Sequence, residues 1–261
     1  MKISKNLKPL FKYAGGKFDE IKYFEKYIPT DFDTYIEPFV GGGGVYFYLN
    51  HSKNVINDLH NEVYSFYSQM KENKQSIIDF MEGSRNQEEY YYRIRAMRPI
   101  NQEEISQRFY YLRKTCYRGL MRYSKKSGFN VSYGNYKTFN FDNLYDERYD
   151  TLFQNTTIHN ESFEKIFEKY NSEDNFVFLD PPYDSVFKNY GENVFDRDNH
   201  KKLFEYFKTT KNKCLMVIGK TDFIEDLYRD YIVDEYEKNY RIRIHSGRMK
   251  PKNTHLIIKN Y

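Results

Sequence analysis

Short apolar runs separated by longer mixed segments dominate the hydrophobic pattern of this chain. Five runs predict strands, at residues 33–39, 55–58, 156–158, 176–179 and 214–218. The clearest of them are near-continuous stretches of Val, Ile, Leu, Phe and Met, which is typical of strands buried on both faces of a parallel sheet. The pattern therefore predicts a buried, mostly parallel sheet.

Helical spacing separates several of these runs. Residues 45–49 predict the start of a helix after the first strand, and a second helical pattern extends from about 198 to 210. Strands that alternate with helices predict a doubly wound α/β sheet. At the end of the chain, residues 231–236, 240–245 and 254–259 alternate polar and apolar side chains, which predicts antiparallel strands.

The block from residue 60 to residue 154 interrupts this order. It begins with helical spacing and becomes basic and glycine-punctuated between residues 117 and 137. We therefore expect residues 1–59 and 155–261 to form one α/β domain. We expect residues 60–154 to form an inserted domain of helices and a hairpin between the second and third strands of the sheet.

Size and composition are consistent with this organisation. The 261 residues suffice for one α/β domain with a large insertion, or for two small domains. The net charge of +4 is lower than that of a pure nucleic-acid-binding module, so a polyanion site requires local clustering of basic residues. The two cysteines, Cys116 and Cys214, lack metal-ligand spacing, which predicts a reduced cytoplasmic protein without a zinc site. The absence of an apolar run of spanning length argues against membrane insertion.

The tetrapeptide Asp180-Pro181-Pro182-Tyr183 directly follows the apolar run at 176–179. Open α/β sheets bind ligands at the carboxyl ends of their strands. The two prolines fix φ and remove two backbone donors, so the loop is stiff. The Asp180 carboxylate and the Pro181 carbonyl can each accept one hydrogen of an exocyclic amino group while Tyr183 stacks on the ring. The alternative for the tetrapeptide alone is a tight turn with a capping aspartate.

Four glycines, at positions 41–44, follow the first expected strand. Glycines permit positive φ and a close approach of the backbone to a ligand. Asp58 lies 21 residues after Glu37, which is the spacing at which an acidic residue holds ribose hydroxyls in dinucleotide-binding units. The glycines do not match the pyrophosphate fingerprint and no Walker lysine follows, which leaves S-adenosylmethionine as the best candidate cofactor. The alternative is a glycine-rich turn with a solvent-facing Asp58.

A basic cluster without acidic residues extends from Arg108 to Lys137. Its basic members are Arg108, Arg113, Lys114, Arg118, Arg122, Lys125, Lys126 and Lys137, and six tyrosines are interleaved with them. Such a cluster can neutralise phosphates, and arginine can read guanine edges. Residues 124–128 are typical of a hairpin turn. The alternative is a solvated basic surface with its tyrosines in a local core.

Taken with the segment 11–17, these motifs resemble the Dam-type adenine-N6 DNA methyltransferases of the alpha group, or D12 class. The resemblance is carried by Phe11-Lys12-Tyr13-Ala14-Gly15-Gly16-Lys17, by residues 36–44 and by Asp180-Pro181-Pro182-Tyr183. Residues 117–123 and 129–137 resemble the DNA-reading hairpin of these enzymes. The four motifs occur in the order of the alpha group and cover most of the chain.

This resemblance implies a Rossmann-like S-adenosylmethionine-dependent methyltransferase sheet with an inserted target-recognition domain. The implied catalytic residues are Asp180, Pro181, Pro182 and Tyr183. The implied cofactor-binding residues are Tyr13, Lys17, Glu37, Pro38, Phe39, Gly41, Gly42, Asp58, Ser162, Phe163 and Asp180. Lys17 is expected to reach the cofactor carboxylate, Asp58 the ribose, and Phe163 the adenine.

The resemblance also implies a DNA-binding set. Its members are Lys12, Tyr117, Arg118, Arg122, Asn135, Tyr136 and Lys137. Lys12 corresponds to a contact with the first base pair of GATC, Tyr117 to an aromatic that inserts into the duplex, and Arg122 to base readout. Arg118 stands where Dam-type enzymes usually carry Asn, and Asn135 stands where they carry a basic residue. The expected recognition sequence is therefore GATC or a related short site. Residues 219–222 differ from the family's target-pocket loop, and their role stays open.

The expected reaction is methylation of N6 of a flipped-out adenine in double-stranded DNA, without a metal. We further expect a monomer in the cytoplasm of a bacterium or of a phage or viral host. The sequence leaves open whether a cognate restriction endonuclease accompanies it. One alternative is methylation of another amino group in RNA or protein, although Asp180 favours adenine or cytosine and the insertion favours duplex DNA. The other is a catalytically silent DNA-binding relative, which the intact tetrapeptide and glycine loop argue against.

Overall fold

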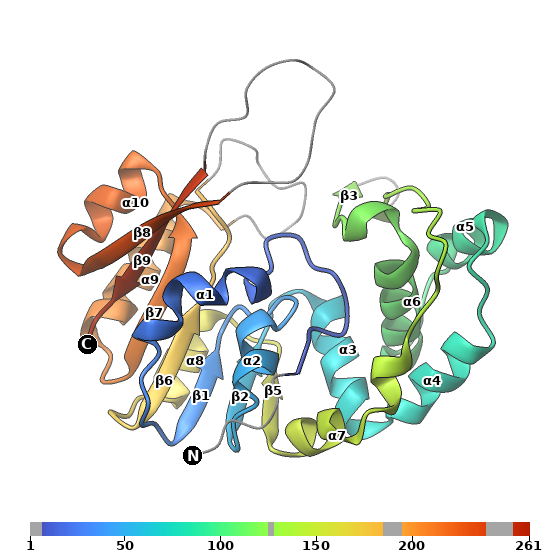
Figure 1. Ribbon diagram of the computed structural model, residues 1–261, viewed down its shortest axis with the longest axis horizontal. Helices are drawn as coiled ribbons and strands as arrows, with labels where there is room; N and C mark the ends of the chain where they lie inside the picture. Colours follow the sequence, from blue (N-terminus) through green and yellow to red (C-terminus); the bar gives the residue numbers. More distant parts are fainter. Residues whose placement is uncertain (1–6, 125–127, 185–194, 239–252) are drawn as a thin grey trace.

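A seven-stranded sheet forms the centre of the molecule (Figure 1). The computed structural model describes residues 7–124, 128–184, 195–238 and 253–261. The strands are β1 (Thr34–Glu37), β2 (Asn54–Asn57), β5 (Thr156–His159), β6 (Asn175–Leu179), β7 (Lys213–Gly219), β8 (Ile232–Lys238) and β9 (Asn253–Lys259). Each of the five apolar runs therefore lies on a strand.

The order of the strands is β5-β2-β1-β6-β7-β9-β8. The strands from β5 to β7 run parallel, whereas β9 is antiparallel to both β7 and β8. The chain order reverses between β1 and β6, and such a switch point is where open α/β sheets place their ligands. The predicted mixed α/β class with a mostly parallel sheet is confirmed.

Two apolar layers cover the sheet because neighbouring residues of a strand point to opposite faces. In β6, Phe176 and Phe178 belong to one buried cluster, while Val177 and Leu179 belong to the other. The first cluster includes side chains of α1 (Ile21–Phe24) and α2 (Gly44–Leu49). The second includes side chains of α8 (Phe163–Lys169), α9 (Arg197–Thr209) and α10 (Asp222–Leu227). Both faces are thus buried, as the unbroken apolar runs require.

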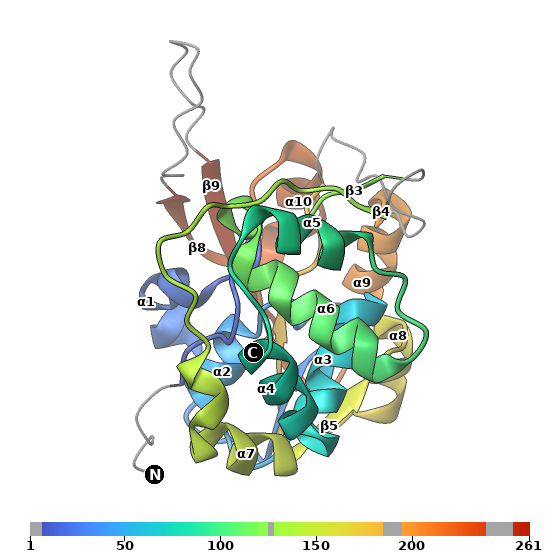
Figure 2. The ribbon, with the colours of Figure 1, turned by 90° about the vertical axis from the view of Figure 1, so that its right-hand side faces the viewer.

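In its described residues, the insertion has five α-helices and a small hairpin, which lie beside the β5 edge of the sheet (Figure 1) and face the viewer in Figure 2. The helices are α3 (Asn61–Glu72), α4 (Lys74–Glu82), α5 (Glu88–Ala96), α6 (Gln102–Thr115) and α7 (Glu147–Gln154). Helix α6 packs against α3, α4 and α5, and both α3 and α7 contact β5. The hairpin pairs β3 (Tyr123–Ser124) with β4 (Gly128–Phe129), as expected for a turn at residues 124–128.

Short 3-10 turns connect these elements. They are η1 (Phe18–Glu20), η2 (Glu25–Tyr27), η3 (Tyr117–Gly119), η4 (Asp142–Tyr145) and η5 (Arg229–Tyr231). The helix expected from about 198 to 210 is confirmed as α9, and the Asp196 side chain caps it by accepting from the amides of Asp198 and Asn199. Two of the three expected terminal strands are β8 and β9, and residues 240–245 lie outside the described residues.

Replacement of Phe178 by alanine tests the packing of the sheet. Phe178 is fully buried and stacks on Phe24 of α1 with a centroid distance of 5.4 Å. We expect Phe178→Ala to lower the free energy of unfolding by about 3–5 kcal/mol, because it leaves a cavity under α1. The control Ile100→Ala removes a side chain that is 86% exposed and is expected to change stability by less than about 0.5 kcal/mol. Similar unfolding midpoints in urea for the two variants would contradict this packing.

Candidate active site

A cavity of about 1120 Å³ opens at the switch point, at the carboxyl ends of β1, β2 and β6 and beside the start of α8. It is lined by every residue predicted to be catalytic or cofactor-binding. These are Tyr13, Lys17, Glu37, Pro38, Phe39, Gly41, Gly42, Asp58, Ser162, Phe163, Asp180, Pro181, Pro182 and Tyr183. Motifs far apart in the sequence therefore meet in one place.

The glycine loop owes its shape to two close approaches. Gly41 and Gly43 have positive φ values of 46° and 66°, which side chains rarely tolerate. A Cβ atom on Gly41 or Gly42 would lie only 2.8 or 2.6 Å from the Tyr13 side chain. The loop is also tied to α3, because the Tyr67 hydroxyl donates to the Gly41 carbonyl at 3.0 Å. The glycines thus make room for Tyr13, a reason that spacing alone did not suggest.

Asp58 follows β2 and holds the same loop. Its two carboxylate oxygens accept hydrogen bonds from the backbone amides of Gly41, at 2.9 Å, and His60, at 2.8 Å. Burial raises the pKa of Asp58, while these two backbone donors oppose the rise. Asp58 therefore fixes the glycine loop to the end of β2 from a position on the cavity wall.

Glu37 ends β1 and is buried at the base of the cavity. Its Oε2 accepts from the Tyr35 hydroxyl at 2.7 Å and from the Tyr46 amide at 3.1 Å. Burial is the main cause that raises the pKa of Glu37 to about 8; the Tyr35 hydrogen bond opposes this rise and the nearby Asp180 contributes to it. Burial therefore favours the protonated form of this carboxyl group at neutral pH.

Asp180 is paired with a lysine from the N-terminal motif. The Lys17 ammonium donates to Asp180 Oδ1 at 2.5 Å and to the Tyr183 hydroxyl at 2.9 Å. Burial raises the pKa of Asp180, and the positive charge of Lys17 opposes the rise. The first and last residues of the tetrapeptide are thus joined through one ammonium group.

An aromatic wall closes the cavity beside α8. The rings of Phe39, Phe163 and Phe195 lie within 5.6–5.8 Å of one another, centroid to centroid. Sequence reasoning found Phe39 and Phe163 but missed Phe195, which no motif includes. The signal in the sequence that could have identified Phe195 is its position directly before Asp196, the residue that caps α9.

Asn57 is a second residue that sequence reasoning missed. Its side-chain amide donates to the carbonyls of Pro38 and Glu161, and its oxygen accepts from the Glu161 amide, each at 2.9 Å. The loops that follow β1 and β5 are therefore locked together across β2. Its place at the end of β2, beside Asp58, could have identified it.

Most of the predicted DNA-binding side chains lie outside the cavity. Lys12, Tyr117, Arg118, Arg122, Asn135 and Lys137 are exposed, whereas Tyr136 is half-buried. Arg122 also lines the cavity, and its guanidinium is held by the side chain and carbonyl of Asn130. Two members of the set that are distant in the sequence lie together, because the Lys12 ammonium is 5.2 Å from the Tyr136 ring centroid.

The turn η3 carries two members of this set. Arg118 has a positive φ of 54°, and a Cβ atom on Gly119 would lie 2.6 Å from Lys12 Cβ. Lys12 therefore packs directly under the turn that presents Tyr117 and Arg118.

Two arginines of the basic cluster were wrongly interpreted as phosphate-neutralising residues. Arg108 is buried and pairs with Glu62 at 3.0 Å. Arg113 is buried and donates to the carbonyls of Gly119 and Leu120, so it supports the η3 turn from inside. Tyr110 and Tyr111 are also buried, as the local-core interpretation of the tyrosines allowed.

Residues 219–222, whose role was left open, form a support for the tetrapeptide. The Thr221 hydroxyl caps α10 by accepting from the Ile224 amide and donates to Asp184 at 3.2 Å. A Cβ atom on Gly219 would lie 3.4 Å from the Tyr183 ring. The loop thus lies against the end of the tetrapeptide.

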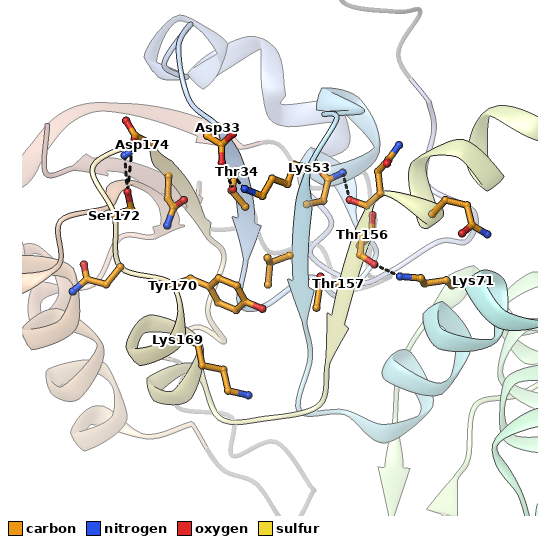
Figure 3. A pocket seen from close by; sticks show the side chains of 16 residues that line it. Asp33, Thr34, Lys53, Lys71, Thr156, Thr157, Lys169, Tyr170, Ser172 and Asp174 are labelled. Atoms are coloured by element: carbon orange, nitrogen blue, oxygen red, sulfur yellow. Dashed lines mark hydrogen bonds and ion pairs between the residues drawn. The ribbon is translucent and has the colours of Figure 1, made fainter.

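A second cleft of about 500 Å³ lies at the opposite, amino edge of the sheet (Figure 3). Figure 3 shows Lys53, Lys71 and Lys169 around it, and Lys71 donates to the Thr156 carbonyl at 2.7 Å. None of the predicted site residues lines this cleft. It has no part in the site described above.

A seven-stranded, mostly parallel sheet with its cavity at the switch point defines an α/β fold consistent with an S-adenosylmethionine-dependent methyltransferase. The model of the D12 class N6 adenine-specific DNA methyltransferases matches residues 13–243. The chain belongs to this family, as the motifs predicted, and is an adenine-specific DNA methyltransferase.

Individual relatives agree with the family. The type II methyltransferase M.CviBI of Paramecium bursaria Chlorella virus NC1A is 51% identical over 260 residues, which cover 98% of this chain and 100% of the relative. The type II methyltransferase M.MjaIII of Methanocaldococcus jannaschii is 30% identical and covers 98% of this chain and 99% of its own length. The DNA adenine methylase of Haemophilus influenzae is 29% identical over 85% of this chain and 82% of its own length.

Within the described ranges, no group of three or more His, Cys, Asp or Glu side chains could hold a metal ion. Of the helices in those ranges, none has both the length and the apolar character that crossing a bilayer requires.

Glu37→Gln tests the raised pKa of Glu37. The folded state keeps the Glu37 proton up to about pH 8, whereas the unfolded chain loses it near the ordinary glutamate pKa of 4.5. The unfolded state therefore binds fewer protons between these values, and stability falls as the pH rises through this window. We expect Glu37→Gln to remove up to about 1.4 kcal/mol per pH unit from that slope in urea unfolding at pH 5 to 8. Glu173→Gln, at an exposed position, should keep the wild-type slope, and an unchanged slope in Glu37→Gln would disprove the assignment.

Proposed function

We propose that the protein transfers a methyl group from S-adenosylmethionine to N6 of an adenine that is flipped out of duplex DNA. The single observation that carries this proposal is the meeting of Asp180-Pro181-Pro182-Tyr183 with the carboxyl groups of Glu37 and Asp58 around one cavity. One part of the cavity can take the cofactor and the tetrapeptide can take the base.

The residues around the cavity fit this cofactor by their chemistry. The carboxyl group of Glu37 and the carboxylate of Asp58 can accept hydrogen bonds from an ammonium group and from ribose hydroxyls. The aromatic wall of Phe39, Phe163 and Phe195 suits an adenine ring. When bound, S-adenosylmethionine would supply the electrophilic sulfonium methyl group.

Asp180 and Pro181 prepare the amino group of the target base. The lone pair of this amino group is delocalised into the ring, which makes it a poor nucleophile. Acceptance of its two hydrogens by the Asp180 carboxylate and the Pro181 carbonyl favours a pyramidal nitrogen with a directed lone pair. The two prolines hold these acceptors in place, and orientation of this kind can contribute about 7–11 kcal/mol. After transfer the nitrogen loses a proton, for which Asp180 need not be a strong base.

The target adenine has to leave the helix to reach this site. Flipping costs a few kcal/mol. Stacking on the Tyr183 ring would return about 1–3 kcal/mol, as for other base–aromatic contacts. Tyr183 is half-buried on the cavity wall, which leaves part of its ring accessible.

We propose that residues 60–154 form the target-recognition domain and that residues 1–59 and 155–261 form the catalytic domain. Arg122 would read a base edge, because it lies both on the cavity wall and on the exposed hairpin. Lys12, Tyr117 and Arg118 would meet the duplex around η3, with Asn135, Tyr136 and Lys137 beside them. The recognised sequence would be GATC or a related short site.

The cellular setting forms a further part of the proposal. The names of two relatives as type II methyltransferases support a cognate restriction endonuclease as a partner of this protein. The protein would act as a monomer on double-stranded DNA in the cytoplasm.

Asp180→Ala tests the proposed chemistry. We expect loss of methyl transfer to adenine in duplex DNA, with cofactor affinity within about tenfold of wild type, because Asp180 mainly serves the amino group. Transfer from radiolabelled S-adenosylmethionine, followed by nucleoside chromatography, also separates N6-methyladenine from methylcytosine. Asp174→Ala, at the opposite edge of the sheet, is the control and should retain activity. Turnover of Asp180→Ala comparable to wild type would refute the mechanism, and a methylated cytosine would refute the substrate.

Arg122→Ala tests base readout by the hairpin. We expect methylation to spread to sites altered at one base pair, with a loss of discrimination of about 1–3 kcal/mol there. Lys137→Ala, a phosphate-contact candidate, should weaken binding to all sequences alike. Comparison of methylated sites after limited reaction measures both effects. Unchanged site preference in Arg122→Ala would assign base readout to another residue.

A further inference from the structure

All three donors of Lys17 are occupied by acceptors of this chain. Its ammonium donates to Asp180 Oδ1 at 2.5 Å, to the Tyr183 hydroxyl at 2.9 Å and to the Gly15 carbonyl at 3.0 Å. An ammonium group has three hydrogens, so a fourth partner requires the loss of one of these contacts. The residue is only 2% exposed, which excludes water as an alternative partner for most of its surface.

The pairing with Asp180 differs from the way the neighbouring carboxylates are held. Glu37 accepts from a hydroxyl and an amide, and Asp58 accepts from two amides. Those donors are neutral dipoles. Asp180 instead contacts a full positive charge, and removal of one member of such a largely buried pair leaves an uncompensated charge.

Tyr183 is also held by Lys17. The ammonium lies 5.1 Å from the Tyr183 ring centroid in addition to its hydrogen bond with the hydroxyl. The ring of the buried His255 packs against Tyr183 edge to face, at 5.6 Å and 84°. Lys17 and His255 therefore constrain the Tyr183 ring together, and Lys17 links its position to that of Asp180.

We propose that Lys17 is a positioning residue of the catalytic tetrapeptide, which holds Asp180 ionised and in register with Tyr183, and is not a ligand of the cofactor carboxylate. The role rests on the proposed function, because it acts through the acceptor of the adenine amino group. It also changes the expectation from the family resemblance, in which Lys17 reaches the cofactor.

The charge balance around Asp180 determines what loss of Lys17 would do. Six titratable groups interact with Asp180 electrostatically or belong to its hydrogen-bonded cluster. They are Lys17, Tyr13, Glu20, Glu37, Tyr183 and Lys238. Lys238 is already paired with Glu20, so it offers little compensation. Within the described part of the chain, Lys17 is the one cation in contact with Asp180. Its removal would therefore raise the pKa of Asp180 further and protonate the acceptor at a higher pH.

Lys17→Met and Lys17→Arg provide the first test. For Lys17→Met, we expect single-turnover transfer at pH 7 to fall by about 100-fold or more. The acidic limb of its pH profile should rise by about one unit or more, with the cofactor dissociation constant within about threefold of wild type. Lys17→Arg keeps the charge, so its acidic limb should stay near that of wild type. A cofactor affinity weakened by more than about tenfold, with an unchanged acidic limb and a rate restored at saturating cofactor, would overturn the proposal.

A double-mutant cycle without methyl transfer provides the second test. Lys17→Gln, Asp180→Asn and the double variant are compared by urea unfolding of the unliganded protein. We expect a coupling of about tenfold or more in the unfolding equilibrium constant, because Asp180→Asn removes the charge that Lys17→Gln leaves unpaired. Additive effects would overturn the role of Lys17. If the cycle shows coupling but the wild-type protein methylates no adenine, the result would contradict the proposed function alone.

Discussion

Burial of three acidic side chains at one edge of the sheet is the constraint on which the site depends. Glu37, Asp58 and Asp180 follow or end three neighbouring strands, and parallel strands bring their carboxyl ends to the same edge. Burial raises the pKa of all three carboxyl groups. Each is stabilised differently: Glu37 by its proton and a hydroxyl, Asp58 by backbone amides, and Asp180 by Lys17. These compensating contacts fix the loops that make up the cavity.

The same contacts explain how distant segments come to act as one unit. Asp58 anchors the glycine loop, the glycine loop leaves room for Tyr13, and the segment of Tyr13 continues to Lys17. Lys17 then reaches the tetrapeptide on the far side of the switch point. On the other side of Tyr13, Lys12 packs under η3, the turn expected to face the duplex. The N-terminal motif therefore connects cofactor, catalytic and DNA-facing segments.

The sheet and the cavity could be predicted because local signals determine them. Unbroken apolar runs mark strands such as Phe176–Leu179, and residues at strand ends meet wherever the strands are parallel. No local signal in the sequence shows whether a basic residue lies on the buried or the exposed face of its helix. Arg108 and Arg113 lie on α6 among aromatic side chains, and only their contacts with Glu62 and with the η3 carbonyls reveal that they are buried.

Partners far apart in the sequence were equally beyond prediction. The contact between Lys17 and Asp180 joins residues 163 positions apart, and the carboxylate of Glu20 pairs with His255 and Lys238 at the other end of the chain. Motif spacing indicates that such residues share a site. It does not indicate which of them compensates the charge of another, since that depends on the packing of β8, β9 and η1.

The most direct test of the central claim is a single-base map of N6-methyladenine in the genome of a methylation-deficient host that expresses this protein. The account predicts methylation at one short recurring motif, absent from cells that express Asp180→Asn at the same level. The recurring motif would also identify the recognition sequence. An unmethylated genome in cells that contain soluble, cofactor-binding wild-type protein would contradict the account.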